Sequence, residues 1–152
     1  MITDRTYSDV ERAIRIRAEK ILKFIEPTEE ERAVLERGFA TISTIQRIEE
    51  KQREIFFRLK ELGYFGAEIE TKEWRDGDVF YMEDLRRIIK NDMALIGSFS
   101  KKKTTPSRIS EEYSIHSFNA LEKILVDLEE IISSVVSNYK FVGENYCGEF
   151  RI

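Results

Sequence analysis

The segment Ser43–Leu62 reads STIQRIEEKQREIFFRLKEL and carries the longest apolar periodicity of the chain. One polar residue interrupts a row of apolar residues three or four positions apart: Ile45, Ile48, Gln52, Ile55, Leu59 and Leu62. This spacing puts the row on one face of an α-helix, much as in a coiled-coil seam. Gly63 follows, and glycine tolerates the left-handed conformation that ends many helices. The segment therefore predicts an amphipathic helix about 30 Å long.

A short form of this pattern occurs three times, and each copy opens a helical stretch. The copies read IQRIE at 45–49, LRRII at 85–89 and FNALE at 118–122. The second copy predicts a helix that begins near Glu83 and weakens at Gly97, and the third predicts a helix over Ser117–Asn138. The chain thus repeats one plan for packing helices.

Two further helices are predicted near the N-terminus. Ser8 and Glu11 have the spacing of a capping box, which predicts a helix over Asp9–Ile25. The apolar stripe expected for that helix consists of Val10, Ile14, Arg17, Ile21 and Phe24. Thr28, followed by three glutamates, predicts a short second helix that Gly38 ends in a left-handed conformation.

The residues outside these helices fall into three segments. Residues 64–82 lose the helical period and predict a structured connector, with a turn or short hairpin at Asp76–Gly77. Residues 100–112 are polar and basic and predict a mobile loop. Residues 139–152 alternate aromatic and polar residues, which predicts one or two short β-strands. We therefore expect a helical domain over 1–138 and a β-like C-terminal tail.

The predicted fold class is mainly α, with four to five helices and a short β-rich tail. Apolar stripes of similar length bury one another best when helices pack side by side. The sequence is compatible with an up-and-down bundle or with an extended coiled-coil-like assembly.

Composition and charge narrow the classes of function. The chain has 152 residues, a net charge of −4 and a single cysteine. Nucleic-acid binders usually carry clustered Lys and Arg, so no nucleic-acid partner is expected. No apolar run is long enough to span a membrane, and no signal peptide is expected at the N-terminus. One cysteine also excludes an intramolecular disulfide.

The residue types that carry catalysis or bind metals are scarce. His116 and Cys147 are the only residues of their kinds, and a zinc site normally needs three or four ligands. Paired glutamates such as Glu49–Glu50 stand on helix faces that are expected to be solvated. We therefore predict no catalytic residue, no cofactor and no metal, and expect a protein that is not an enzyme.

Other residues are candidates for protein contacts. Gln52 and Asp92 interrupt apolar stripes, either as seam residues that fix register and copy number or as residues at the stripe's edge. An exposed apolar patch along Phe56, Ile96 and Phe99 would favour assembly. Four aromatic residues of the tail could cover the bundle or pair with another chain by strand addition: Tyr139, Phe141, Tyr146 and Phe150.

These helices resemble small structural proteins of the tail or baseplate region of tailed phages and prophages of Gram-positive bacteria, and N-terminal parts of fibre-like proteins. The matching pieces are Thr44–Glu49, Trp74–Asp78 leading into Glu83–Ile88, Ser117–Glu122 and, more weakly, Asp9–Ile14. The resemblance implies a structural component without catalytic residues. It also makes Trp74 a candidate interaction residue.

Two hypotheses of function follow. The first is a non-enzymatic assembly protein of a phage tail, baseplate or phage-tail-like particle. It would be made in the bacterial cytoplasm, form a homo-oligomer and dock onto other tail components. The alternative is a cytosolic bacterial helical adaptor or regulator that binds one protein partner.

Overall fold

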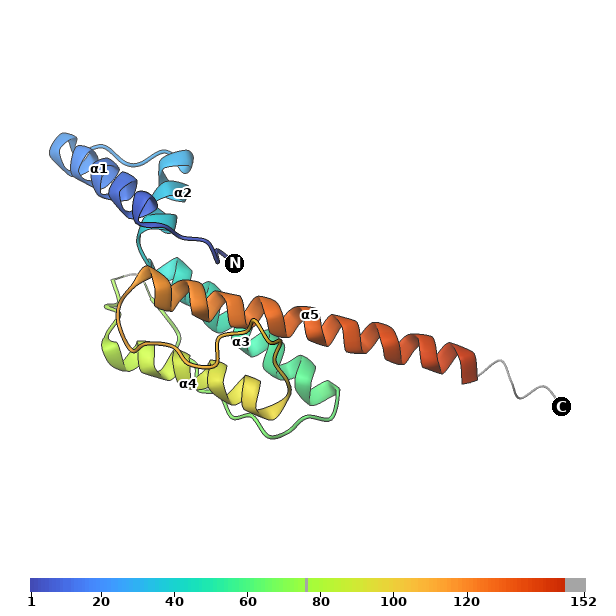
Figure 1. Cartoon of the computed structure of the whole chain (residues 1–152). Coiled ribbons are helices and arrows are strands. Elements are labelled where there is room, and N and C mark those ends of the chain that lie inside the picture. Colours follow the sequence, from blue (N-terminus) through green and yellow to red (C-terminus); the bar gives the residue numbers. More distant parts are fainter. Residues whose placement is uncertain (76, 147–152) are drawn as a thin grey trace.

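The computed structural model describes residues 1–75 and 77–146, with side chains up to residue 139. This part of the chain forms five α-helices and no β-strand (Figure 1). The helices are α1 (Tyr7–Lys23), α2 (Glu29–Gly38), α3 (Ile42–Glu61), α4 (Met82–Ser98) and α5 (Ile115–Tyr146). The prediction of a mainly α fold is confirmed.

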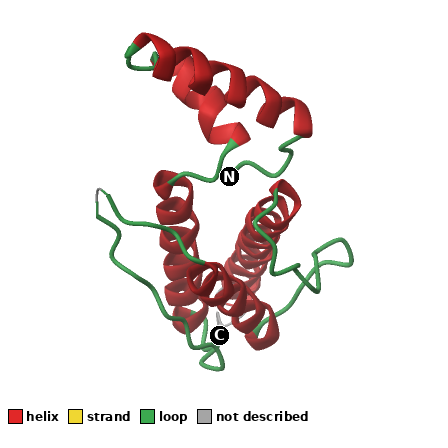
Figure 2. Ribbon diagram, turned by 90° about the vertical axis from the view of Figure 1, so that its left-hand side faces the viewer, coloured by secondary structure: helices red, strands yellow, loops and turns green. Residues whose placement is uncertain are grey.

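The helices form two unequal groups. Helices α3, α4 and α5 pack against one another as a bundle, whereas α1 and α2 pack chiefly on each other. Figure 2 shows this hairpin of two helices standing on one end of the bundle. In Figure 1, the far end of α5 projects past the ends of α3 and α4.

The three bundle helices run in the same direction. Glu49 of α3 pairs with Arg87 of α4, and Gln52, three residues later, bonds to Asp92. Arg47 of α3 likewise pairs with Glu122 of α5, and the later Lys51 pairs with the later Glu129, with 2.6 Å between Lys51 Nζ and Glu129 Oε1. The up-and-down arrangement considered from the sequence is therefore wrong. Both connections are long enough to run back along the bundle, whereas antiparallel neighbours are usually joined by short loops.

The bundle core consists of large aliphatic side chains. Twelve of them are essentially inaccessible to solvent: Ile45, Ile48, Ile55, Leu59, Leu85, Ile88, Leu95, Leu121, Ile124, Leu125, Leu128 and Ile132. They come from all three parallel helices, at the three- and four-residue spacings of the apolar stripes. Burial of such side chains contributes roughly 1.5–3 kcal/mol each, which makes this core the main source of stability.

The connector between α3 and α4 is irregular but held in place. The side-chain oxygen of Asn91 accepts a hydrogen bond from the backbone N–H of Glu70 at 3.0 Å. The Asn91 Nδ2 donates to the carbonyl oxygen of Glu70 at 2.8 Å. Gly77 has φ +91°, so the predicted turn is present. The short hairpin is not, because the described residues on either side of the turn form no strands.

The connection between α4 and α5 also contacts the bundle. Thr105 Oγ1 donates to Asp127 Oδ2 at 2.7 Å, and Ile109 is buried in the core. These contacts place part of the predicted loop 100–112 against α5. Its mobility stays a prediction.

The first helix begins earlier than expected. Thr6 and Asp9 form the capping box: the Asp9 carboxylate accepts from the Thr6 N–H at 2.8 Å, and Thr6 Oγ1 accepts from the Asp9 N–H at 3.3 Å. The box predicted at Ser8 and Glu11 is wrong. Both pairs have the capping-box spacing, and the earlier pair lets Tyr7 join the helix.

Gly38 has a different role from the one predicted. It is the last residue of α2, and the chain leaves the helix through Phe39 in an extended conformation, not through a left-handed glycine. A Cβ atom on Gly38 would overlap Ala13 of α1 and lie 2.6 Å from the Asp9 carbonyl oxygen. Gly38 therefore permits the close approach of the two hairpin helices.

The end of α5 corrects the prediction of a β-like tail. The helix continues through Tyr139 to Tyr146, so residues 139–146 form no strand. Aromatic residues favour strands only weakly, and an established helix lengthens at little cost per added residue. The strand prediction for residues 147–152 lies outside the described residues.

Candidate functional site

Two predicted interaction residues meet inside the bundle. Gln52 Nε2 donates to Asp92 Oδ1 at 2.8 Å and to the carbonyl oxygen of Ile88 at 2.9 Å. Asn91 Nδ2 donates to Gln52 Oε1 at 3.0 Å. Gln52, Asn91 and Asp92 are all buried, so the alternative that places Gln52 and Asp92 at the edge of the stripe is wrong. Their role in fixing register stays a prediction.

This polar layer joins α3 to α4 within one chain. Asp92 Oδ2 has no hydrogen-bond partner among the described residues. Burial raises the pKa of the Asp92 carboxyl well above its usual range, against the smaller lowering effect of the bond from Gln52. A carboxyl that stays protonated here avoids a buried negative charge. The layer therefore serves internal packing and presents no surface to a partner.

A second buried polar cluster joins the hairpin to the bundle. Glu122 of α5 accepts from Arg5 Nη2 at 2.8 Å, from Arg47 Nη2 at 3.0 Å and from the backbone N–H of Ile2. The Glu122 side chain is fully buried, and that of Arg5 is nearly so. Arg47 also pairs with Glu36 of α2. One carboxylate thus links the N-terminal segment, α3 and α5.

Further bonds support this joint from both sides. The Asn119 side chain accepts from the Arg5 N–H at 3.1 Å and donates to the Arg5 carbonyl oxygen at 2.9 Å. Within the hairpin, Arg37 Nε donates to Asp9 Oδ1 at 3.3 Å, and its Nη2 donates to Asp4 Oδ1 at the same distance. These bonds hold the hairpin in a defined position on the end of the bundle.

The hairpin leaves much of its apolar surface exposed. Ile14 is 53% exposed, Ile21 61% and Leu22 80%, whereas Ala13 is the one buried residue of α1. The predicted stripe through Ile14 and Ile21 is therefore not the buried face, because the small pair Ala13 and Gly38 sets the contact with α2. The exposed side chains Ile14, Ile21 and Leu22 were not among the predicted interaction residues, although their positions could be read from the sequence.

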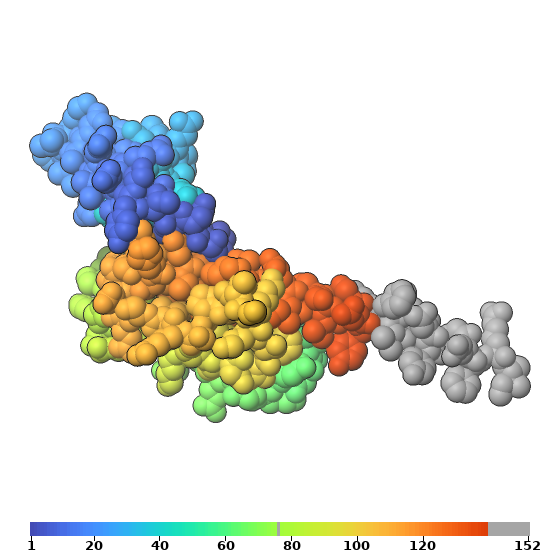
Figure 3. Space-filling model, viewed as in Figure 1, coloured from blue at the N-terminus to red at the C-terminus, as the bar shows by residue number. Residues whose placement is uncertain are grey.

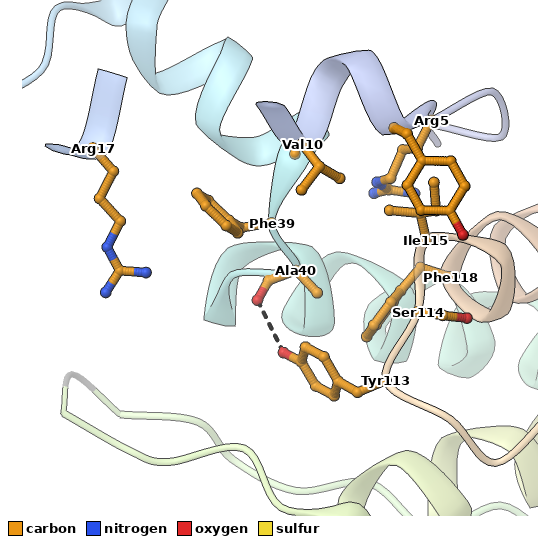
Figure 4. Close-up of a pocket in the computed structure, with 11 residues that line it drawn as sticks. Arg5, Val10, Arg17, Phe39, Ala40, Tyr113, Ser114, Ile115 and Phe118 are labelled. Carbon is orange, nitrogen blue, oxygen red and sulfur yellow. Dashed lines mark hydrogen bonds between the residues drawn. The ribbon is translucent and has the colours of Figure 1, made fainter. Parts of the chain in front are cut away.

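A cavity of about 470 Å³ lies where the hairpin meets the bundle (Figure 4). Val10, Phe39 and Phe118 give it apolar walls, and Arg17 stands with its guanidinium carbon 5.6 Å from the centre of the Phe39 ring. Tyr113 Oη donates to the Ala40 carbonyl oxygen at 3.2 Å, as the dashed line in Figure 4 marks. The cavity is large enough for an apolar side chain of a partner.

The other predicted residues do not form a common surface. Phe56, Ile96 and Phe99 are half-buried and pack against the core, so the exposed patch expected along them is not found. The Phe99 ring lies 4.7 Å from that of Tyr64, centre to centre. Tyr64, in the connection after α3, thus covers Phe99, and the helical stripes alone did not reveal this contact.

Trp74 and Tyr139 have contrasting surroundings. Trp74 Nε1 donates to Glu49, and Lys72 Nζ lies 4.1 Å from its ring centre. Trp74 therefore fixes the connector to α3. Tyr139 is 69% exposed on the projecting end of α5. The predicted sites Phe141, Tyr146 and Phe150 lie outside the described side chains.

His116, Cys147 and the acidic side chains are the residue types relevant to catalysis and metal binding. His116 is exposed and packs its ring 5.7 Å from that of Tyr7. Within the described residues, no group of three or more His, Cys, Asp or Glu side chains could hold a metal ion. Among the described helices, none combines the length and the hydropathy that a membrane span requires. Cys147 lies outside them.

Comparison with protein-family models, curated proteins and solved structures finds no match for this chain. The residues themselves must therefore support any inference of function. Among the surfaces described above, the exposed apolar face of α1 is the strongest candidate site, because the other apolar rows are covered by the fold.

Proposed function

We propose that this chain is a non-enzymatic assembly protein of a phage tail, baseplate or phage-tail-like particle. In this role the bundle is a rigid support and the hairpin docks onto neighbouring protein subunits. The observation that carries the proposal is the exposed apolar face of α1 on a hairpin that is itself firmly anchored. Monomers rarely expose apolar surface of this kind without a binding role.

The geometry of the joint supports docking by a rigid element. Glu122 and its arginines fix the hairpin at one end of the bundle, and in Figure 3 the hairpin, coloured blue, projects from that end of the body. Pre-ordered surfaces lose less conformational entropy on binding than flexible ones. A protein built this way suits repeated attachment in a symmetrical particle. The phage-tail setting itself rests on the sequence resemblance at Thr44–Glu49, Trp74–Asp78 and Ser117–Glu122.

Particle fractionation tests the proposed function. Tail or tail-like particles would be purified by density gradient from the bacterium that encodes the chain, and digested peptides would be identified by mass spectrometry. We expect peptides of this chain to sediment with the particles in a constant ratio to a major tail protein. An abundant cytosolic enzyme, which must be absent from these fractions, is the control. Recovery of the chain only in the particle-free supernatant would contradict the proposal.

The cavity at the joint favours a second candidate function. A cytosolic adaptor or regulator could receive an apolar side chain of one partner between Phe39 and Phe118, with Arg17 beside an acidic group of that partner. The same fractionation separates the two functions, because an adaptor would stay in the supernatant.

A further inference from the structure

The cavity between the hairpin and the bundle has walls from separate parts of the chain. Val10 and Arg17 belong to α1, Phe39 lies in the connection from α2 to α3, and Phe118 belongs to α5. A volume of about 470 Å³ is typical of sites that hold small ligands, and such sites are common where two structural units meet. The cavity therefore has the size and the position of a site for a compact ligand.

Aromatic rings form much of the cavity wall. The aromatic residues among those that line it are Tyr7, Phe39, Tyr113 and Phe118. The rings of Tyr113 and Phe118 lie 5.4 Å apart, centre to centre, with 75° between their planes. Aromatic rings pack favourably on one another in edge-to-face and offset arrangements. We therefore expect the apolar part of a ligand to be a flat aromatic ring.

The charged residues that line the cavity are both arginines. Arg5 and Arg17 are the two, and no described acidic residue joins them in the wall. The Arg5 guanidinium already pairs with the Glu122 carboxylate at 2.8 Å. Arg17 is exposed and lies beside the Phe39 ring, as Figure 4 shows, and no described carboxylate forms an ion pair with it. The cavity thus offers one accessible positive charge next to an aromatic surface.

The acidic residues around the cavity do not compensate this charge. Glu112 precedes Tyr113 in the chain, but it is exposed and does not line the cavity. The other acidic residues near these elements have basic partners: Asp4 and Asp9 pair with Arg37, Glu31 with Lys20, Glu36 with Arg47, and Glu111 with Arg86. A planar guanidinium binds a carboxylate through two parallel hydrogen bonds. A carboxylate on the ligand would therefore give Arg17 the partner that these residues do not supply.

We propose that this cavity binds a small aromatic carboxylate, with its ring between Phe39 and Phe118 and its carboxylate on Arg17. The occupant is a separate small molecule, because walls on both the hairpin and the bundle surround a compact body better than an extended chain. It is thus not the partner side chain of the second candidate function. The inference does not rest on the proposed assembly role. A bound ligand would add a further link between the hairpin and the bundle.

Nuclear magnetic resonance on the isotope-labelled full chain, titrated with naphthoate, tests this inference. We expect a dissociation constant of about 0.1–1 mM for a molecule of this size. The backbone amide signals of Phe39, Ala40 and Phe118 should shift most, because these residues line the cavity. Naphthamide has the same ring without the charge. It should bind about 5-fold more weakly, because it forms no ion pair with Arg17.

Two arginine variants separate the ion pair from general attraction to a basic helix. Arg17→Gln should weaken naphthoate binding about 5-fold and leave naphthamide binding unchanged. Arg15→Gln is the matched control, because Arg15 is also an exposed arginine of α1 but does not line the cavity. It should bind naphthoate as the native chain does. Both side chains are exposed, so the circular dichroism spectrum should stay the same in both variants.

Three results of the titration overturn the inference. The first is the absence of shifts with naphthoate up to about 5 mM, well above the expected dissociation constant. The second is equal binding of naphthoate by the native chain and Arg17→Gln. The third is a set of shifts confined to the exposed face of α1 around Ile14 and Ile21.

A peptide tests the competing occupant. A capped peptide with one glutamate next to one phenylalanine carries the same chemical groups on a protein backbone. We expect it to bind more weakly than naphthoate. Tighter binding of the peptide at the same amide signals would overturn the inference in favour of a protein partner. These titrations and the particle fractionation measure different properties, so the inference and the proposed function can fail separately.

Discussion

The bundle and the hairpin are built from similar amphipathic helices, but they use their apolar residues differently. In the bundle, large aliphatic residues such as Leu125 and Ile132 are completely buried. In the hairpin, the closest approach of the helices is between Ala13 and Gly38, while Ile14 and Ile21 remain exposed. The bundle therefore buries its apolar stripes within the chain, whereas the hairpin leaves an apolar face of α1 exposed.

The largest effect is expected at the joint between the two regions. Glu122→Gln removes the negative charge that Arg5 and Arg47 share in a buried position. Breaking a buried ion pair from one side typically costs about 3–5 kcal/mol, because the remaining charge stays desolvated. Chemical denaturation should detect the loss. Hydrogen exchange should rise first in α1 and α2 and stay slow in the bundle core.

Glu129→Gln is the matched control for this change. Glu129 lies on α5, as Glu122 does, and pairs with Lys51 of α3. Its side chain, however, is partly exposed. Partly exposed ion pairs contribute little, so this variant should lose less than about 1 kcal/mol. Equal losses for the two variants would mean that Glu122 does not anchor the hairpin.

The next effect concerns the interior of the bundle. Asp92→Asn keeps the acceptor for Gln52 and resembles the protonated carboxyl. Burial raises the pKa of Asp92 in the folded chain. Between the unfolded and folded pKa values, the unfolded chain therefore binds fewer protons than the folded chain. In this range the free energy of unfolding falls as pH rises. The variant has no titrating group at this position, so its stability does not fall with pH in this way. It should match the native chain near pH 4 and be the more stable of the two at pH 7.

Asp127→Asn should show the opposite pH dependence. Burial alone would raise the pKa of Asp127, but hydrogen bonds from Lys123 and Thr105 outweigh it and lower the pKa. Asp127 therefore contributes stability above its unfolded pKa, and this contribution is lost as pH falls through the folded value. The variant should lose stability at pH 7 and lose less near pH 3. Urea unfolding across this range checks both variants, and parallel curves for the two would contradict the assignment.

The sequence predicted the helices better than their arrangement. Each helix combines an apolar period with local start or stop signals, such as Thr28 before α2 and Gly63 after α3, so neighbouring residues suffice to identify it. The relative direction of the three bundle helices depends on the path of the connections between them. The bonds between Asn91 and Glu70 that hold the first connection join residues far apart in the chain, and no local pattern reveals them.

The candidate site shows the same limit. Gln52 and Asp92 were identified as unusual because they interrupt apolar stripes, but their direct contact depends on the parallel register of α3 and α4. On α1, both faces carry apolar residues, so periodicity alone could not decide which face is buried. Ala13 and Gly38 determine which face of α1 is buried, because their small size allows α1 and α2 to approach each other most closely there.

The smallest effect tests that close approach directly. Gly38→Ala places a methyl group against Ala13 and the Asp9 carbonyl oxygen, which should separate α1 from α2 and cost about 1–2 kcal/mol in spite of alanine's higher helix propensity. Gly97→Ala, near the end of α4, meets open space and should stabilise the chain by up to about 1 kcal/mol. Thermal unfolding of the two variants should therefore shift in opposite directions. If Gly38→Ala stabilised the chain as well, the hairpin helices would have room between them. Ala13 would then not decide which face of α1 is buried, and the exposure of Ile14 and Ile21 would need another physical cause.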